Sequence, residues 1–341
     1  MLTFTRMTAK ALFVVGLAIA VAASADAHAA PLLIVSADAA GDVVVVDPAK
    51  AQVVERIKVG ARPRGLKLAK NRKQLFVTLS GAPKAATPAA PSAGVAVVDI
   101  ATRKVTKVIA TPPSPLAVDI SPDGQTAYVA NNETDELLVI DVGAGSVTKK
   151  IPVGTEPVAV AISPDGKVVY VATRTANELT AIDVKTLSLL TRVDAGMRPQ
   201  AIAIASRGDV AFVPDESIPS VTLVDLKKHM SKSYFMVQPL PKTTPPAALQ
   251  SAVFSPDGKR LYVTTGFGRS VAIIDPVKKV TVAMIDDVGA FPRGIAISAD
   301  GKKLYTANGP SNDVAIIDVA SKKVQARDAV PGAPWSVVFV P

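Results

Sequence analysis

Residues 158–199 read VAVAISPDGKVVYVATRTANELTAIDVKTLSLLTRVDAGMRP, and related units recur along the chain. Branched apolar residues dominate four segments of this unit, and such residues favour β-strands. The Ser-Pro-Asp-Gly sequence at 163–166 has the proline and glycine of a tight turn between two strands. The unit therefore predicts four short strands, at residues 158–162, 168–172, 178–183 and 188–193.

An aspartate that follows two apolar residues marks each unit. These aspartates are Asp47, Asp99, Asp141, Asp183, Asp225, Asp275 and Asp318. Their successive separations are 52, 42, 42, 42, 50 and 43 residues. A period near 42 residues with strand-like content is typical of the four-stranded blades of a β-propeller.

A second marker, an aromatic residue or isoleucine, lies 13 residues before six of these aspartates. It is Ile34, Tyr128, Tyr170, Phe212, Tyr262 or Tyr305. The exception, Phe76, lies 23 residues before Asp99, which indicates a ten-residue insertion at 81–94. We also predict a long loop at 226–249, between a third strand and the next first strand. Tyr234, Phe235 and Met236 fall in it.

The two ends of the repeat region complement each other. Residues 32–36 correspond to a second strand, and residues 335–340 to a lone first strand. Pairing them would complete one blade and remove the open edges of a linear array. We therefore predict an all-β, seven-bladed β-propeller of four-stranded antiparallel blades, closed by pairing of the N- and C-terminal strands.

Small residues support blades that converge on an axis. A short connection of the form Gly-x-x-Pro precedes most of the first strands, and we number positions from its proline. The second residue after this proline is always small: Gly65, Ala117, Ala159, Ala201, Ser251, Gly294 and Ser336. A stacked β-helix, the alternative fold, does not require small residues there.

The repeats resemble the YVTN-repeat β-propeller family. The resemblance rests on Tyr128-Val-Ala-Asn131, Tyr170-Val-Ala-Thr173, Tyr262-Val-Thr-Thr265 and Tyr305-Thr-Ala-Asn308, with their aspartate and Ser-Pro-Asp-Gly partners. Residues 291–298 and 304–313 look most like the branch associated with periplasmic PQQ-dependent (quinoprotein) alcohol catabolism. That branch implies an accessory role. The single tryptophan, Trp335, does not supply the repeated tryptophans with which quinoprotein dehydrogenases bind the quinone.

The N-terminus predicts export. Arg6 and Lys10 precede an uncharged apolar run, and small residues near Ala27 or Ala29 offer a cleavage site. We predict a signal peptide at 1–30 and one propeller domain at 31–341. The apolar run is shorter than the roughly 20 residues of a bilayer span. We therefore expect a periplasmic or secreted protein with no membrane span after cleavage.

Composition limits the chemistry. The chain has no cysteine and only two histidines, His28 and His229. Disulfides, thiolate metal sites and histidine-based catalytic triads are therefore excluded. The seven repeat aspartates are expected to accept hydrogen bonds in their own turns. We predict no catalytic residue set, no metal site and no cofactor.

The residue directly after the proline of each connection predicts a site. These residues are Arg64, Leu116, Val158, Gln200, Gln250, Arg293 and Trp335, with Leu249 in place of the proline before Gln250. In a propeller they would form an unevenly polar ring at one mouth of the channel, suited to a specific ligand. The predicted ligand-binding residues are Arg64, Gln200, Gln250, Arg293 and Trp335 from this ring, with Asn131, Arg174, Arg269 and Asn308 from neighbouring loops.

The sequence is compatible with three functions. The first is a monomeric, non-catalytic binding or scaffold protein for a protein partner or small acidic ligand in the periplasm. The second is a lactonase-like hydrolase or isomerase, with Asp215 or Glu216 as base and Arg64 or Arg293 stabilising an oxyanion. The third, binding of nucleic acid or another anionic polymer, rests on the net charge of +9. The basic residues are dispersed, which disfavours it. The sequence favours the first interpretation.

Overall fold

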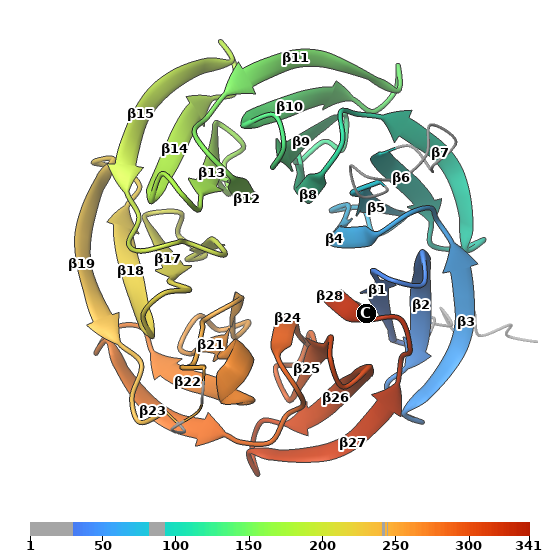
Figure 1. The fold of residues 1–341 in the computed structure, drawn as a ribbon, viewed down its shortest axis with the longest axis vertical. Coiled ribbons are helices and arrows are strands. Elements are labelled where there is room, and N and C mark those ends of the chain that lie inside the picture. The colour runs from blue at the N-terminus through green and yellow to red at the C-terminus, as the bar shows by residue number, and fades with distance from the viewer. Residues whose placement is uncertain (1–29, 82–92, 241–242, 244) are drawn as a thin grey trace, which may run out of the picture.

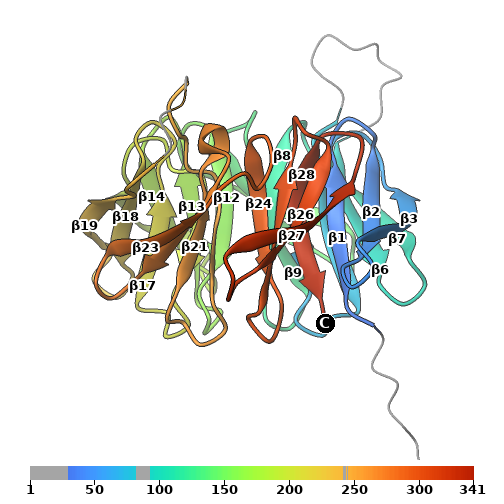
Figure 2. The ribbon, with the colours of Figure 1, turned by 90° about the horizontal axis from the view of Figure 1, so that it is seen from below.

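A computed structural model describes residues 30–81, 93–240, 243 and 245–341. These residues form seven four-stranded antiparallel sheets around a central axis, which confirms the predicted seven-bladed propeller (Figure 1). Viewed from the side, the sheets stand upright around that axis (Figure 2). Among the described residues, no helix has the length and apolar content to cross a membrane.

Each blade is named by its order in the chain, with its strands given from the axis outward. Blade one contains β28 (Pro334–Val340), β1 (Leu32–Ala37), β2 (Asp42–Asp47) and β3 (Gln52–Lys58). Blade two contains β4 (Pro63–Leu68), β5 (Gln74–Leu79), β6 (Gly94–Asp99) and β7 (Lys104–Ala110). Blade three contains β8 (Pro115–Ile120), β9 (Thr126–Asn131), β10 (Glu136–Asp141) and β11 (Ser146–Pro152). Blade four contains β12 (Pro157–Ile162), β13 (Val168–Thr173), β14 (Glu178–Asp183) and β15 (Ser188–Asp194).

The remaining blades follow the same pattern. Blade five contains β16 (Ala203–Ile204), β17 (Val210–Pro214), β18 (Ser220–Asp225) and β19 (Met230–Met236). Blade six contains β20 (Ala252–Phe254), β21 (Leu261–Thr264), β22 (Val271–Asp275) and β23 (Val280–Ile285), with a short 3₁₀ helix η1 (Gly266–Gly268) between β21 and β22. Blade seven contains β24 (Pro292–Ile297), β25 (Lys303–Asn308), β26 (Asp313–Asp318) and β27 (Lys323–Ala329).

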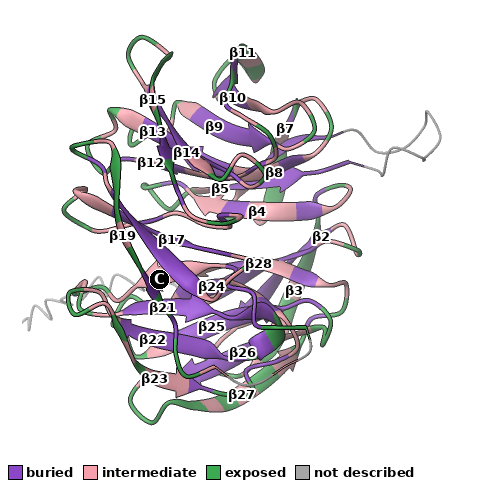
Figure 3. Cartoon of the chain, turned by 60° about the vertical axis from the view of Figure 1, so that its left-hand side comes forward, coloured by how far each residue is buried: buried purple, intermediate pink, exposed green. Residues whose placement is uncertain are grey.

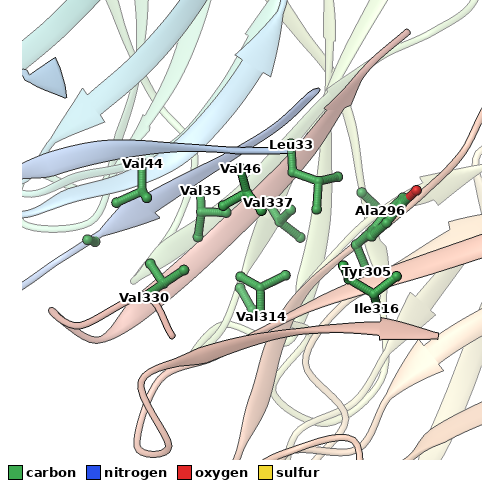
Figure 4. Packing of buried hydrophobic residues seen from close by; sticks show 12 residues of the cluster. Leu33, Val35, Val44, Val46, Ala296, Tyr305, Val314, Ile316, Val330 and Val337 are labelled. Atoms are coloured by element: carbon green, nitrogen blue, oxygen red, sulfur yellow. The ribbon is translucent and has the colours of Figure 1, made fainter. Parts of the chain in front are cut away.

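The ring closes where blade one meets blade seven. β28 pairs antiparallel with β1, with Ile34 opposite Val338. Apolar side chains from both blades pack together at this junction (Figure 4). Among them, Tyr305 of blade seven stacks on Phe339 of blade one, with ring centroids 5.7 Å apart. Closure therefore rests on both strand pairing and core packing.

Burial follows the position of a strand in its blade. The two middle strands are almost wholly buried, because neighbouring blades pack against both of their faces (Figure 3). The outermost strands alternate exposed and partly buried residues, as in β3 and β7. The runs of Val and Ile in the middle strands fit this two-sided burial.

The repeat aspartates end the third strands, as predicted. Each accepts a backbone N–H of its own turn, as when the Thr102 N–H donates to Asp99 and the Thr186 N–H to Asp183. In the last copy, hydrogen bonds from Ser321 and Lys303 lower the pKa of Asp318 to about 2. These aspartates therefore have a structural role in the turns.

One sequence-based prediction of a loop is wrong, and two other predicted segments lie wholly or mostly outside the described residues. The prediction that Tyr234, Phe235 and Met236 belong to a long loop is wrong, because they form the end of the fourth strand β19. A strand forms there because Phe235 is buried opposite Val221 of β18. The predicted signal peptide and most of the 81–94 insertion lie outside the described residues.

Candidate functional site

A cavity of about 300 Å³ opens where the innermost strands begin. Its lining includes the seven predicted ring residues, six of which directly follow a connection proline while Gln250 follows Leu249, and the seven small residues after them. The small residues are required by crowding at the axis: a Cβ on Gly294 would lie 2.8 Å from the Cα of Ser336. The structure thus brings the two expected rings together around one channel mouth.

Trp335 lies between two arginines at this mouth. The guanidinium carbon of Arg64, from blade two, is 4.1 Å from the centroid of its ring, and that of Arg293, from blade seven, is 4.0 Å away. Arg64 also donates from Nε to Asp38 at 3.0 Å. The cation–π contacts and this ion pair hold both guanidinium groups in the cavity.

Arg293 differs from Arg64 in its electrostatic partners. Among the described residues, no carboxylate lies within ion-pair distance of Arg293, whose other contact is the Phe291 ring at 4.7 Å. Burial and the positive charge of Arg64 lower the pKa of Arg293 to about 10. It nevertheless stays charged at neutral pH, so the cavity presents a positive group that has no counter-ion in the part of the chain that the structure describes.

The opposite arc of the mouth belongs to blades four and five. Glu216 accepts from Arg198 Nε at 3.0 Å and lies 4.0 Å from Arg174. Arg174 in turn forms a bidentate ion pair with Glu156, which lowers the pKa of Glu156 to about 2. Glu216 and Arg174 line the same cavity as Arg293, and both charges act on the pKa of Arg293.

The two predicted glutamines also line the mouth. Gln250 is buried and donates to the Leu249 carbonyl at 3.3 Å, whereas the Gln200 side-chain nitrogen has no partner among the described residues. Of the nine predicted ligand-binding residues, six line this cavity: Arg64, Arg174, Gln200, Gln250, Arg293 and Trp335.

The structure does not place the other three at the mouth. Asn131 and Asn308 are fully buried, and their amides donate to the carbonyls of Pro112 and Val288. Arg269 follows η1 and lies 3.9 Å from Asp287, outside the cavity lining. The two asparagines are structural because the second strand ends with their side chains turned into the blade.

A third ring was predicted only in part, because Arg174 and Glu216 were named from the sequence whereas Asn132 and Asp38 were missed. This ring is formed by the residue four positions after the aromatic or isoleucine marker. It places Asn132, Arg174 and Glu216 in the cavity lining, and Asp38 in an ion pair with Arg64. The signal was present as a constant offset of four residues from the aromatic marker. The two carboxylates proposed as bases also separate: Glu216 lines the mouth, whereas Asp215 lines another cavity between blades four and five.

The mouth combines the Glu216 carboxylate with an arginine, Arg293, that has no counter-ion among the described residues. Such a set can activate water with the carboxylate and stabilise an oxyanion with the guanidinium. Among the residues that the structure describes, no three His, Asp or Glu side chains are grouped so as to hold a metal ion.

Comparisons with known proteins agree with the fold. The family model "Choice-of-anchor I domain" matches residues 1–197, and the model "Lactonase, 7-bladed beta-propeller" matches residues 191–336. No curated protein sequence matches the chain significantly.

Three solved structures illustrate the likeness. The periplasmic gluconolactonase of Pseudomonas aeruginosa is 19% identical, with a TM-score of 0.75 over 91% of this chain and 99% of that one. A candidate 6-phosphogluconolactonase of Bacteroides fragilis is 17% identical, with a TM-score of 0.75 over 92% and 99%. Kuenenia stuttgartiensis hydrazine synthase is 22% identical, with a TM-score of 0.67 over 81% and 89%. At these identities the likeness shows the fold.

Proposed function

This chain belongs to the choice-of-anchor I domain family, and from the geometry of its channel mouth we propose that it is a lactonase-like hydrolase acting on an anionic lactone. One observation supports this most directly. A single cavity contains the Glu216 carboxylate and the Arg293 guanidinium, which has no counter-ion among the described residues. These are the base and the oxyanion-stabilising group that hydrolysis of an ester needs.

The sequence-based interpretation as a non-catalytic binding or scaffold protein is wrong. It is contradicted by the match of residues 191–336 to the lactonase propeller family and by structural neighbours named as a gluconolactonase and as a candidate 6-phosphogluconolactonase. That interpretation rested on the absence of a nucleophile–base set. Hydrolysis by activated water needs no protein nucleophile, so the absence did not exclude an enzyme.

The proposed reaction uses residues already in place. Glu216, held by Arg198 Nε at 3.0 Å, takes a proton from a water whose oxygen attacks the lactone carbonyl carbon. The resulting oxyanion is stabilised by Arg293. When the bond between the acyl carbon and the ring oxygen breaks, the leaving oxygen takes the proton back from Glu216, and the product is a hydroxy acid.

The positive mouth selects the substrate. Arg64 and Arg293 flank Trp335 at the mouth. A lactone with a phosphate or carboxylate would neutralise this charge, and its ring would pack on the indole. We therefore propose a sugar-acid lactone with an anionic group.

The test measures acid release from a panel of lactones, with and without added divalent ions, after background hydrolysis is subtracted. The panel contains glucono-δ-lactone, 6-phosphoglucono-δ-lactone and δ-valerolactone. Glu216→Gln should lower kcat by about 10²- to 10⁴-fold. The matched control is Glu55→Gln, because Glu55 on the outer strand β3 forms an exposed ion pair with Arg103, in the turn before β7, and neither lines the cavity. Failure to hydrolyse any lactone above background, or a Glu216→Gln variant with full activity, would overturn the proposal.

We further propose the setting implied by the YVTN-repeat resemblance: an exported protein working beside quinoprotein oxidation. Oxidation of a cyclic hemiacetal gives a lactone, so a lactonase would consume the product of such an oxidation. Fractionation of cells that express the full chain tests this. We expect a periplasmic protein with a mature N-terminus near Ala27 or Ala29, whereas an uncleaved cytoplasmic product would contradict it.

A further inference from the structure

Asp215 is a buried carboxyl group that the proposed reaction does not use. It directly follows β17 and is only 1% exposed. Its side chain lines a cavity of about 570 Å³ between blades four and five, next to the channel mouth. Its Oδ2 atom accepts from the hydroxyls of Ser220 and Thr222, but Oδ1 has no partner among the described residues.

In three other blades, a side-chain donor binds a carbonyl of the connection that leads into the blade. Asn308 of blade seven donates to Val288 O at 2.8 Å. Asn131 of blade three donates to Pro112 O at 3.0 Å, and Thr180 of blade four donates to Val153 O at 2.7 Å. This donor fixes the connection against the strands that it precedes.

Asp215 occupies the position of Asn308. Each is the third residue after its aromatic marker, Phe212 or Tyr305. Each also lies against a connection glycine with positive φ: a Cβ on Gly196 would overlap Asp215 Oδ1, and a Cβ on Gly289 would overlap Asn308 Nδ2. In blade five, Oδ1 of Asp215 therefore lies beside the connection 195–200, at the position that the donating amide nitrogen of Asn308 has in blade seven. An ionised carboxylate has no proton to donate there.

The surroundings of Asp215 favour a proton on this oxygen. Facing it are Asp194 at the end of β15, Glu178 at the start of β14 and Tyr234 on β19. The basic groups in this region already have acidic partners: Arg192 forms an ion pair with Glu178 at 3.8 Å, and Arg198 forms one with Glu216. Burial, with a smaller contribution from the charge of Asp194, raises the pKa of Asp215 to about 7 despite the two hydroxyl donors.

The connection 195–200 also positions Glu216. The Glu216 N–H donates to Arg198 O at 3.0 Å, and the Gln200 N–H donates to Pro214 O at 3.0 Å. Arg198 then orients the Glu216 carboxylate through its Nε. A change in how the connection sits against β17 would therefore move the proposed base.

We propose that Asp215 is a positioning residue for Glu216: its protonated carboxyl donates from Oδ1 to the connection 195–200, and loss of that proton displaces Arg198 and Glu216 at the channel mouth. This inference rests on the proposed function for its kinetic consequence. Its structural part, a protonated acid that fixes the connection, does not depend on turnover.

The experiment compares the full-length protein with Asp215→Asn and Asp215→Leu between pH 5.5 and 8. Asn keeps a donor at the position, as at Asn308, whereas Leu removes it. Protonated Asp215 falls from roughly nine-tenths to one-tenth between pH 6 and 8, so kcat of the native protein should fall about tenfold. Asp215→Asn should stay active without this fall in kcat, and Asp215→Leu should be weakly active at every pH. Asp194→Asn serves as the control. Its kcat should still fall with rising pH, but at slightly lower pH, because removal of the negative charge of Asp194 eases ionisation of Asp215.

Two NMR signals make the inference testable without turnover. The ¹³C signal of the Asp215 carboxyl should titrate near pH 7, and the Arg198 Nε–H signal should shift over the same range in the native protein but not in Asp215→Asn. A carboxyl that titrates near pH 4 overturns the inference, and so does an unchanged Arg198 signal. If both signals behave as expected but no lactone is hydrolysed, the proposed function fails while the positioning role of Asp215 stands.

Discussion

Blades five and seven place different residues at the same point of the same repeat. In blade seven, Asn308 is fully buried and its amide donates to Val288 O and to Asp313. In blade five, Asp215 is equally buried, and its Oδ1, which takes the place of the Asn308 amide nitrogen, has no partner among the described residues, as is also true of Asn308 Oδ1. The difference is one group, NH₂ against O. It turns a pH-independent hydrogen bond into one that requires a proton.

The comparison also explains why blade five differs from the other blades at the mouth. Glu216, next to Asp215, is the one carboxylate among the described residues that line the channel cavity. A proton-dependent contact and the proposed base therefore share one strand end. A repeat scaffold can change its chemistry in a single blade because the other blades keep the ring closed.

The largest expected effect is on how the free energy of unfolding depends on pH. The folded state raises the pKa of Asp215 from 3.8 to about 7, so it binds this proton more tightly than the unfolded chain. The stabilisation is complete below about pH 4 and is lost as the pH rises through 7, a loss on the order of 4 kcal/mol. Urea unfolding of the native protein and Asp215→Asn at several pH values measures it. The difference between their free energies of unfolding should change between about pH 4 and pH 8. A constant difference would contradict a protonated Asp215 in the folded state.

The reverse exchange, Asn308→Asp, should give blade seven the behaviour of blade five. The new carboxyl would be buried beside Asp313, which accepts from the amide at 2.6 Å in the native protein. We expect a loss of about 3 kcal/mol at pH 8 and a smaller loss at pH 5. Urea unfolding at the two pH values tests this. Equal losses at both would mean that the position does not impose protonation on a carboxyl.

A smaller loss is expected for Gly196→Ala. Gly196 has φ of 89°, and a Cβ there would overlap Asp215 and Thr222. Strain and overlap together should cost about 2 kcal/mol. The control is Gly124→Ala, because Gly124 has φ of 77° and an added Cβ there would meet no atom within 4 Å, so it should lose about 1 kcal/mol. Thermal unfolding compares the two, and equal losses would show that Asp215 does not press on the connection.

The smallest effect is expected on the far side of the mouth. Arg64→Gln should raise KM for an anionic lactone about tenfold and leave the fall in kcat near pH 7 in place, because Arg64 belongs to blade two and has no role in the proposed proton transfer. Arg269→Gln, outside the cavity lining, is the control. Steady-state kinetics with 6-phosphoglucono-δ-lactone checks it. If the fall in kcat near pH 7 disappeared in Arg64→Gln, it could not be assigned to blade five.

Much of the fold was predictable because each repeat carries the pattern of its own strands. The spacing of Asp141, Asp183 and Asp225 and the complementary ends of the chain sufficed for seven blades and their closure. The prediction failed at Tyr234 and Phe235, where the loop-like charges of 227–232 hid a fourth strand. An outer strand needs few apolar residues, so its sequence signal is weak.

The candidate site was predictable only in part. Residues counted from the proline gave Arg64, Arg293 and Trp335 correctly as neighbours at the mouth. Asn131 and Asn308 were misplaced, because their offsets do not tell whether a side chain at the end of a strand turns toward the channel or into the blade.

The sequence by itself determined the number of blades, the order of their strands and the rings of residues at the axis, because a repeated period dictates repeated structure. The tertiary structure alone decided which charges have partners: Arg64 pairs with Asp38 while Arg293 lacks a carboxylate among the described residues, and Asp215 and Glu216, adjacent in the chain, enter different cavities. Charge pairing depends on distances and burial across blades, and these exist only once the ring has closed.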